Sequence, residues 1–83
     1  MRRPMDELLQ KLTNVRKDLI KRYCYLDPHL DEAIQALAEG RAHACGDILH
    51  LRLVVYDDWN WDEVFLQLHN VWCALTPTSP QAA

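Results

Sequence analysis

The chain has 83 residues, of which 49% are hydrophobic and 25% are charged, and its formal net charge at pH 7 is −3. This length predicts one helical domain, residues 1–76, and the composition differs from that of a disordered chain. No apolar run reaches the roughly 18 residues of a membrane span. Three cysteines without paired spacing argue against a disulfide framework. We therefore expect a cytoplasmic protein without membrane contact.

Charge is distributed unevenly along the chain. Residues 1–22 carry seven Lys or Arg against three acids, whereas residues 23–83 carry two against nine. Such asymmetry indicates either surfaces that complement each other within the chain or a basic surface for an anionic partner.

Residues 4–26 have the hydrophobic spacing of an amphipathic helix. Its apolar stripe is formed by Met5, Leu8, Leu12, Val15, Leu19, Tyr23 and Leu26. Arg16 interrupts this stripe, and two interpretations are open. Its stem can pack on the stripe while its head reaches water or an acid of the same chain, or the guanidinium can contact a partner.

A short second helix is predicted to follow Asp27, which has the side chain of an N-cap, and Pro28, which suits a first helical position. Its buried face is expected to comprise Leu30, Ala33, Ile34, Leu37 and Ala38. Gly40 then serves as the C′ residue that ends the helix.

Residues 41–56 can be interpreted as a helix or, in part, as a strand. As a helix, the segment has two neighbouring apolar faces, so we expect it to be the central helix against which the first and last helices pack. Arg52 then falls on the apolar side and requires an acid nearby. As a strand, residues 48–56 alternate in polarity but find a partner only in a second copy of the chain. Length and context favour the helix.

Asp57 and Asp58 are expected to end this segment. Asn60 and Glu63 then have the spacing of a capping box for the last helix, with Trp59 as part of a hydrophobic staple. The wide apolar face of that helix comprises Trp61, Val64, Phe65, Leu68, Val71, Trp72 and Leu75. A second, narrower strip comprises Leu66, His69 and Cys73. Residues 77–83 are polar and contain proline, which predicts a disordered C-terminal tail.

These elements predict an all-α fold, a small antiparallel bundle of three or four helices. The apolar surface exceeds what one short chain needs for its core, so we also expect a homodimer in which two chains share that surface.

Catalytic groups are sparse in this sequence, and we predict no catalytic residue, no cofactor and no enzyme activity. His43, Asp47 and His50 lie on one side of the third predicted helix at i, i+4 and i+7, which suits a divalent metal and makes a metal-dependent enzyme one alternative. These three residues do not form part of a known zinc-binding motif, so a polar face exposed to solvent is the simpler interpretation.

A nucleic-acid-associated regulator is the other alternative. Lys17, Lys21 and Arg22 lie on the polar side of the first helix, after Arg2 and Arg3. The net negative charge argues against this alternative, because nucleic-acid-binding domains are strongly basic.

Residues 57–63 are the best candidate for a binding segment, because two tryptophans stand among four acids. We expect Trp61 to point inward and Trp59 to lie partly outward. The sequence therefore predicts a non-enzymatic protein that binds and modulates another protein, which has a basic surface, as an adaptor, anti-activator, inhibitor or immunity-type factor. The predicted contact residues are Arg16, Tyr56, Asp57, Asp58, Trp59 and Leu66.

Overall fold

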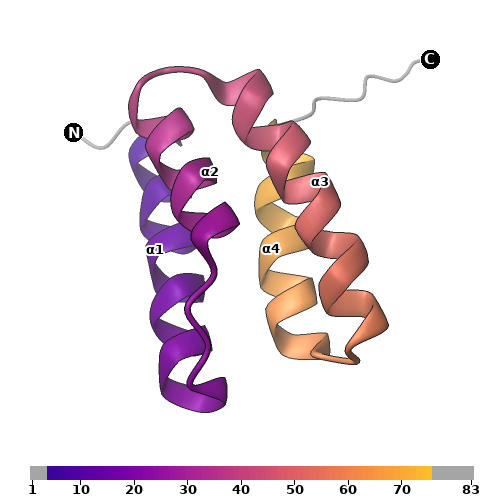
Figure 1. The fold of residues 1–83 in the computed structure, drawn as a ribbon. Helices are drawn as coiled ribbons and strands as arrows, with labels where there is room; N and C mark the ends of the chain where they lie inside the picture. Colours follow the sequence, from indigo (N-terminus) through magenta and orange to yellow (C-terminus); the bar gives the residue numbers. More distant parts are fainter. Residues whose placement is uncertain (1–3, 76–83) are drawn as a thin grey trace.

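Four α-helices make up the fold of residues 4–75, which are the residues that the computed structural model describes (Figure 1). They are α1 (Pro4–Tyr23), α2 (Pro28–Ala38), α3 (Ala42–Asp58) and α4 (Asp62–Leu75). The all-α prediction is confirmed, and residues 4–75 contain no strand. The predicted tail, residues 77–83, lies outside the described part of the chain. None of the helices in residues 4–75 is long and apolar enough to cross a membrane.

The four helices form a ring in which α1 and α3 lie diagonally opposite each other. Helix α3 contacts α2 and α4, and α1 contacts the same two helices. Figure 1 shows α1 with α2 on one side of the molecule and α3 with α4 on the other. The prediction that residues 48–56 form a central helix against which the first and last helices pack was therefore wrong in part, because α1 is not a neighbour of α3. The small buried residues Ala33 and Ala36 allow the short helix α2 to pack closely against its neighbours.

One chain closes the hydrophobic core without a second copy. All four helices contribute side chains that are almost fully buried. The largest are Leu12, Leu19, Leu30, Leu49, Tyr56 and Leu68. The homodimer expected from surplus apolar surface is therefore not required to complete the core.

Helix α3 buries one apolar face fully and the second only in part, with Ala44, Ile48 and Val55 half-buried against the core. Cys45, Leu49, Leu53 and Tyr56 are buried, at the spacing of a helical stripe. This confirms the helical interpretation of the segment. Leu51, which sequence reasoning assigned to an apolar face of the helix, is 64% exposed. Only two helices pack against α3, so part of its apolar circumference stays at the surface.

Helices α2 and α3 end in the same way, at a residue with positive φ. Gly40 has φ 83°, and the N–H of Arg41 donates to the carbonyl of Ala36 at 2.8 Å, so the predicted C′ role of Gly40 is confirmed. At the end of α3, Asn60 has φ 60°, and the N–H of Trp61 donates to the carbonyl of Tyr56 at 3.0 Å. Asparagine tolerates this left-handed conformation well.

The structure corrects three predicted helix boundaries: the start of α4, the end of α3 and the end of α1. Asn60 is the C′ residue of α3 and not the N-cap of α4, so the capping box with Glu63 does not form; Glu63 pairs instead with Arg22 of α1. Helix α3 continues through Asp58 rather than ending before Asp57. Helix α1 ends at Tyr23 and not at residue 26, because Cys24 turns the chain with φ 51°.

Candidate protein-binding surface

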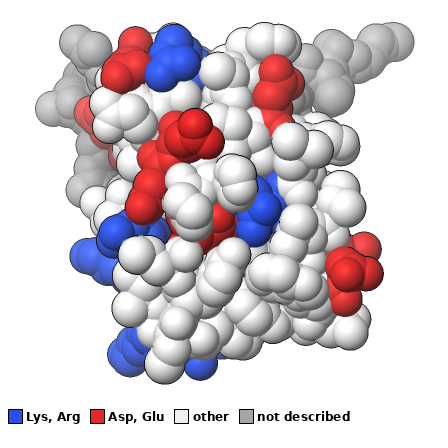
Figure 2. All heavy atoms as spheres, in the orientation of Figure 1, with Lys and Arg blue, Asp and Glu red and all other residues white. Residues whose placement is uncertain are grey.

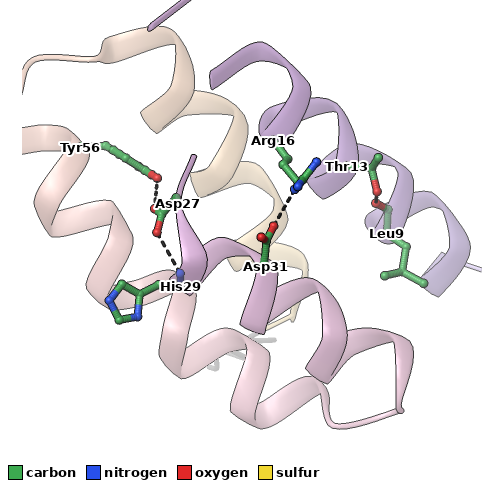
Figure 3. Close-up of polar contacts among 7 residues, drawn as sticks. All are labelled: Leu9, Thr13, Arg16, Asp27, His29, Asp31 and Tyr56. Carbon is green, nitrogen blue, oxygen red and sulfur yellow. Dashed lines mark hydrogen bonds and ion pairs between the residues drawn. The ribbon is translucent and has the colours of Figure 1, made fainter. Parts of the chain in front are cut away.

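A buried polar cluster centred on Asp27 joins the start of α2 to α3. The side chain of Asp27 accepts a hydrogen bond from the N–H of His29 at 2.9 Å, as an N-cap does. It also accepts bonds from Arg52 Nε at 2.8 Å and from the Tyr56 hydroxyl (Figure 3 shows the bonds to His29 and Tyr56). The predicted N-cap and the predicted acid for Arg52 are both confirmed, and they are the same residue.

The charges in this cluster are stabilised by one another. Burial raises the pKa of Tyr56, and the hydrogen bond to Asp27 raises it further, so the phenol stays neutral. Burial is the largest single effect on the pKa of Arg52 and lowers it, but the charge and hydrogen bond of Asp27 and the interactions with Tyr56 together outweigh burial, and the pKa is raised. The cluster therefore holds residues 24–27, the connection between α1 and α2, against α3.

An aromatic cluster lies beside this connection. Trp61 is sandwiched between Tyr23, at 4.0 Å between ring centroids, and Tyr56, at 5.8 Å, with nearly parallel planes in both pairs. Trp59 meets Trp61 at 4.9 Å and Tyr25 at 5.6 Å, with its ring inclined to both. Trp59 is 40% exposed. Trp61 is thus the inner ring and Trp59 the outer one, as expected.

The outer side of α3 carries the candidate site. We define the α3 surface as Leu51, Val54, Asp57, Asp58 and Trp59. All five are exposed, and a shallow hollow at the end of the helix is lined by Val54, Asp57, Asp58 and Trp59, together with Val55. The structure therefore brings together three of the predicted contact residues, Asp57, Asp58 and Trp59.

The charge around the α3 surface is negative. Neither Asp57 nor Asp58 forms an ion pair with another residue between positions 4 and 75. Figure 2 shows an uncharged area over the lower part of this face, where Figure 1 places the connection from α1 to α2 and the end of α3, with acidic side chains at its right-hand margin. The exposed apolar side chains of Leu51, Val54 and Trp59 beside acids suit a partner that offers apolar side chains and basic groups.

The other three predicted contact residues lie elsewhere. Tyr56 is fully buried, so its prediction as a contact residue is corrected: it supports Trp61 and Asp27 from within. Arg16 Nε donates to Asp31 Oδ1 at 2.6 Å, which ties α1 to α2 (Figure 3). This contact fits the interpretation in which Arg16 reaches an acid of its own chain. Leu66 is 59% exposed on α4, outside the α3 surface.

Sequence reasoning missed two residues of this surface, Leu51 and Val54. Leu51 was expected on an apolar face of the helix, and Val54 was assigned to no face. Leu26, expected in the stripe of the first helix, is also exposed, at 58%. The spacing of Cys45, Leu49 and Tyr56 gives a buried face without Leu51 or Val54. The sequence contains this spacing, but it does not show which apolar face is buried. That depends on α3 having only two neighbouring helices among the described residues, α2 and α4.

The structure treats the two alternative sites differently: it separates His50 from His43 and Asp47, whereas Lys17, Lys21 and Arg22 line one hollow on α1. His43 Nε2 lies 3.7 Å from Asp47 Oδ2 on the exposed side of α3, while the ring of His50 faces that of Trp72. No group of three or more His, Cys, Asp or Glu side chains in residues 4–75 could hold a metal ion. On α1, Arg22 pairs with both Asp18 and Glu63, which reduces the positive charge available beside the exposed lysines 17 and 21.

The three cysteines differ in environment, which leads to a prediction of their reactivity. Cys24 and Cys73 are exposed, whereas Cys45 is buried, and burial raises the pKa of its thiol from 9.0 to about 11. We expect a disulfide reagent to modify two thiols rapidly in the folded protein and the third only after unfolding. Counting released chromophore with and without denaturant checks this. Three equally fast thiols would contradict the placement of Cys45.

The same thiol predicts a loss of stability at alkaline pH. Below about pH 9 the Cys45 thiol is protonated in both states; above it the unfolded chain releases the proton while the folded chain keeps it. The free energy of unfolding should therefore fall between pH 9 and 11. Urea unfolding of Cys45→Ala across this window should show a smaller fall than the parent chain.

Comparison with known proteins gives no relative: no protein-family model, no curated protein and no solved structure matches the chain.

Proposed function

We propose that this protein is a non-enzymatic, antiparallel four-helix bundle that binds another protein and modulates it, as an adaptor, anti-activator, inhibitor or immunity-type factor. The partner contacts the α3 surface. The observation that carries the proposal is the exposure of Leu51 and Val54 on α3 and of Trp59 directly after it, beside two acids that have no ion pair in residues 4–75.

Three physical arguments support this site. Large apolar side chains grouped at one surface commonly mark an interface, because their exposure to water is unfavourable. Leu51 and Val54 are 64% and 60% exposed, more than any other large hydrophobic residue in the described chain. Tryptophan is enriched among residues that dominate binding energy, and Trp59 is held in place by three neighbouring rings. Asp57 and Asp58 favour a partner with a basic surface.

The partner can be identified with a photo-reactive amino acid. Placed at Leu51, it should form a cross-link to one defined protein in the native cell, and placed at Lys11 on the diagonally opposite helix it should not. The cross-linked partner is then purified, and its affinity for the isolated chain is measured. A partner captured equally from both positions would contradict binding at the α3 surface.

Matched substitutions test the surface with the purified pair. Val54→Glu should weaken binding at least tenfold, because it places a charge in the apolar centre of the contact. Ile20→Glu is the control, since Ile20 is an exposed apolar residue of α1, with 41% of its surface accessible. We expect its affinity to match that of the parent chain. Equal losses in both variants, with circular dichroism unchanged, would place the contact elsewhere.

A homodimer stays part of the proposal, with exposed Leu66 of α4 in the apolar area that two copies would cover. Sedimentation at low and high concentration tests it, and Leu66→Glu should abolish the dimer while Val54→Glu leaves it intact. A monomer at all concentrations would contradict the dimer.

A further inference from the structure

Next to the α3 surface is an open pocket with aromatic walls. It is lined by Tyr23, Tyr25, Trp59 and Trp61. These residues come from the end of α1, the connection that follows it, and the turn between α3 and α4. The pocket is therefore assembled by segments far apart in the sequence, and Trp59 belongs both to it and to the α3 surface.

The walls stand at different angles, so that they enclose a corner instead of forming one flat stack. The ring of Tyr25 is nearly perpendicular to Trp59, at 87°, and to Trp61, at 77°. Tyr23 lies parallel to Trp61, with 6° between the planes. A group in this corner meets ring faces and ring edges from more than one direction.

This arrangement is held in place before any ligand arrives. Tyr23 and Tyr56 both stack on Trp61, and Tyr56 is bonded to Asp27. Asp27 fixes the segment that carries Tyr25. A pocket whose walls are already ordered loses little conformational freedom on binding.

The electrostatics of the pocket favour a cation. The faces of aromatic rings are electron-rich and attract cations, most strongly in tryptophan. Asp58 precedes Trp59 and Asp62 follows Trp61, and neither acid has an ion pair among the described residues. The nearby Arg22 is already held by Asp18 and Glu63. Lys21, two residues before Tyr23, also has no ion pair among the described residues, so the unpaired charges next to these rings in the sequence are two acids and one lysine, a negative balance.

We propose that the pocket formed by Tyr23, Tyr25, Trp59 and Trp61 binds an arginine side chain of the partner protein. A guanidinium is planar and stacks on aromatic rings, and it is desolvated more easily than the ammonium of lysine. The inference deepens the proposed function, on which it rests, by naming the basic group that the partner presents. The apolar part of the same partner covers Leu51 and Val54.

The test is a titration of the isolated chain, followed by NMR. The probe is a blocked Gly-Arg-Gly tripeptide, and the control is the same peptide with citrulline, which has nearly the same shape without the charge. We expect the arginine peptide to shift the indole N–H signals of Trp59 and Trp61, while that of Trp72, in the groove between α3 and α4, stays in place. The citrulline peptide should bind about two- to fivefold more weakly, as the loss of a cation–π contact implies.

Two variants separate the contributions of ring and charge. Trp59→Leu removes one aromatic wall of the pocket, and Asp58→Asn removes a charge with little change in shape. Each variant should bind the arginine peptide more weakly than the parent chain. Asp47→Asn also removes an exposed carboxylate from α3, but near the other end of the helix, and it should leave the binding of the arginine peptide unchanged. Equal binding of both peptides, shifts that include Trp72, or no shift at tens of millimolar peptide would each overturn the inference.

The outcome is independent of the test of the proposed function. If the tripeptide does not bind but Val54→Glu still weakens partner binding, the α3 surface is supported and the arginine pocket is not. If the tripeptide binds as expected but no partner contacts Leu51, the pocket stands and the proposed function fails.

Discussion

Replacing Asp27 by alanine should lower the free energy of unfolding by about 3–5 kcal/mol, because it leaves a buried charge without its partner. The side chain of Arg52 is 11% exposed, and that of Asp27 is fully buried. The substitution also removes the N-cap of α2 and leaves the Tyr56 hydroxyl without its acceptor. Domains of this size have little stability to lose, so the variant should be largely unfolded at room temperature. Urea unfolding followed by circular dichroism measures the loss.

A matched control is Asp31→Ala. Asp31 also pairs with an arginine, but the side chains of Arg16 and Asp31 are 38% and 43% exposed. Ion pairs in contact with water contribute about 0–1 kcal/mol, so this variant should stay close to the parent chain. The double variant Asp27→Asn with Arg52→Met should lose less than the two single variants added together, because it removes both charges. A loss below about 1 kcal/mol for Asp27→Ala, within the range of a surface pair, would show that the cluster is not buried as described.

Replacing Trp61 by alanine should cost about 3 kcal/mol, the second large effect. Its ring contacts four aromatic neighbours, Tyr23, Tyr25, Tyr56 and Trp59, so the substitution removes packing from all of them at once. The near-ultraviolet circular dichroism should weaken together with stability, because the stacked pairs are lost. Thermal unfolding and the near-ultraviolet spectrum are the two measurements.

Trp59→Ala is the control for Trp61, since both remove an indole from the same turn. Trp59 is 40% exposed and contacts its neighbours by edges, so the loss should be near 1 kcal/mol. Partner binding should show the reverse order, with Trp59→Ala the more damaging of the two. If Trp59→Ala were the less stable variant, the assignment of inner and outer rings would be reversed.

Local signals in the sequence predicted much of the helical structure. Asp27 was expected to begin α2 as its N-cap and Gly40 to end it as the C′ residue, and both do so. Asn60 shows the limit of such signals. An asparagine suits both an N-cap and a left-handed C′ position. The hydrogen bond from the N–H of Trp61 to the carbonyl of Tyr56 shows that Asn60 has the C′ position of α3.

The candidate site was harder to predict because it depends on which helices are neighbours. Asp57, Asp58 and Trp59 were recognised from their composition, and they lie together. Tyr56 stands one residue earlier, yet it is buried, because one step along a helix turns the side chain by about 100°. Leu51 was misassigned for a related reason: hydrophobicity shows that a side chain avoids water, but not which helix covers it.

The diagonal placement of α1 and α3 makes the molecule electrically polar. Lys11, Lys17 and Lys21 are exposed on α1, and Asp57 and Asp58 are exposed on α3 across the bundle. A basic protein at a distance would turn such a molecule so that α3 faces it before the two surfaces touch. The field that orients the encounter is weakened by salt, while the apolar contact that follows is not. The rate of association should therefore fall with ionic strength much more steeply than the rate of dissociation changes.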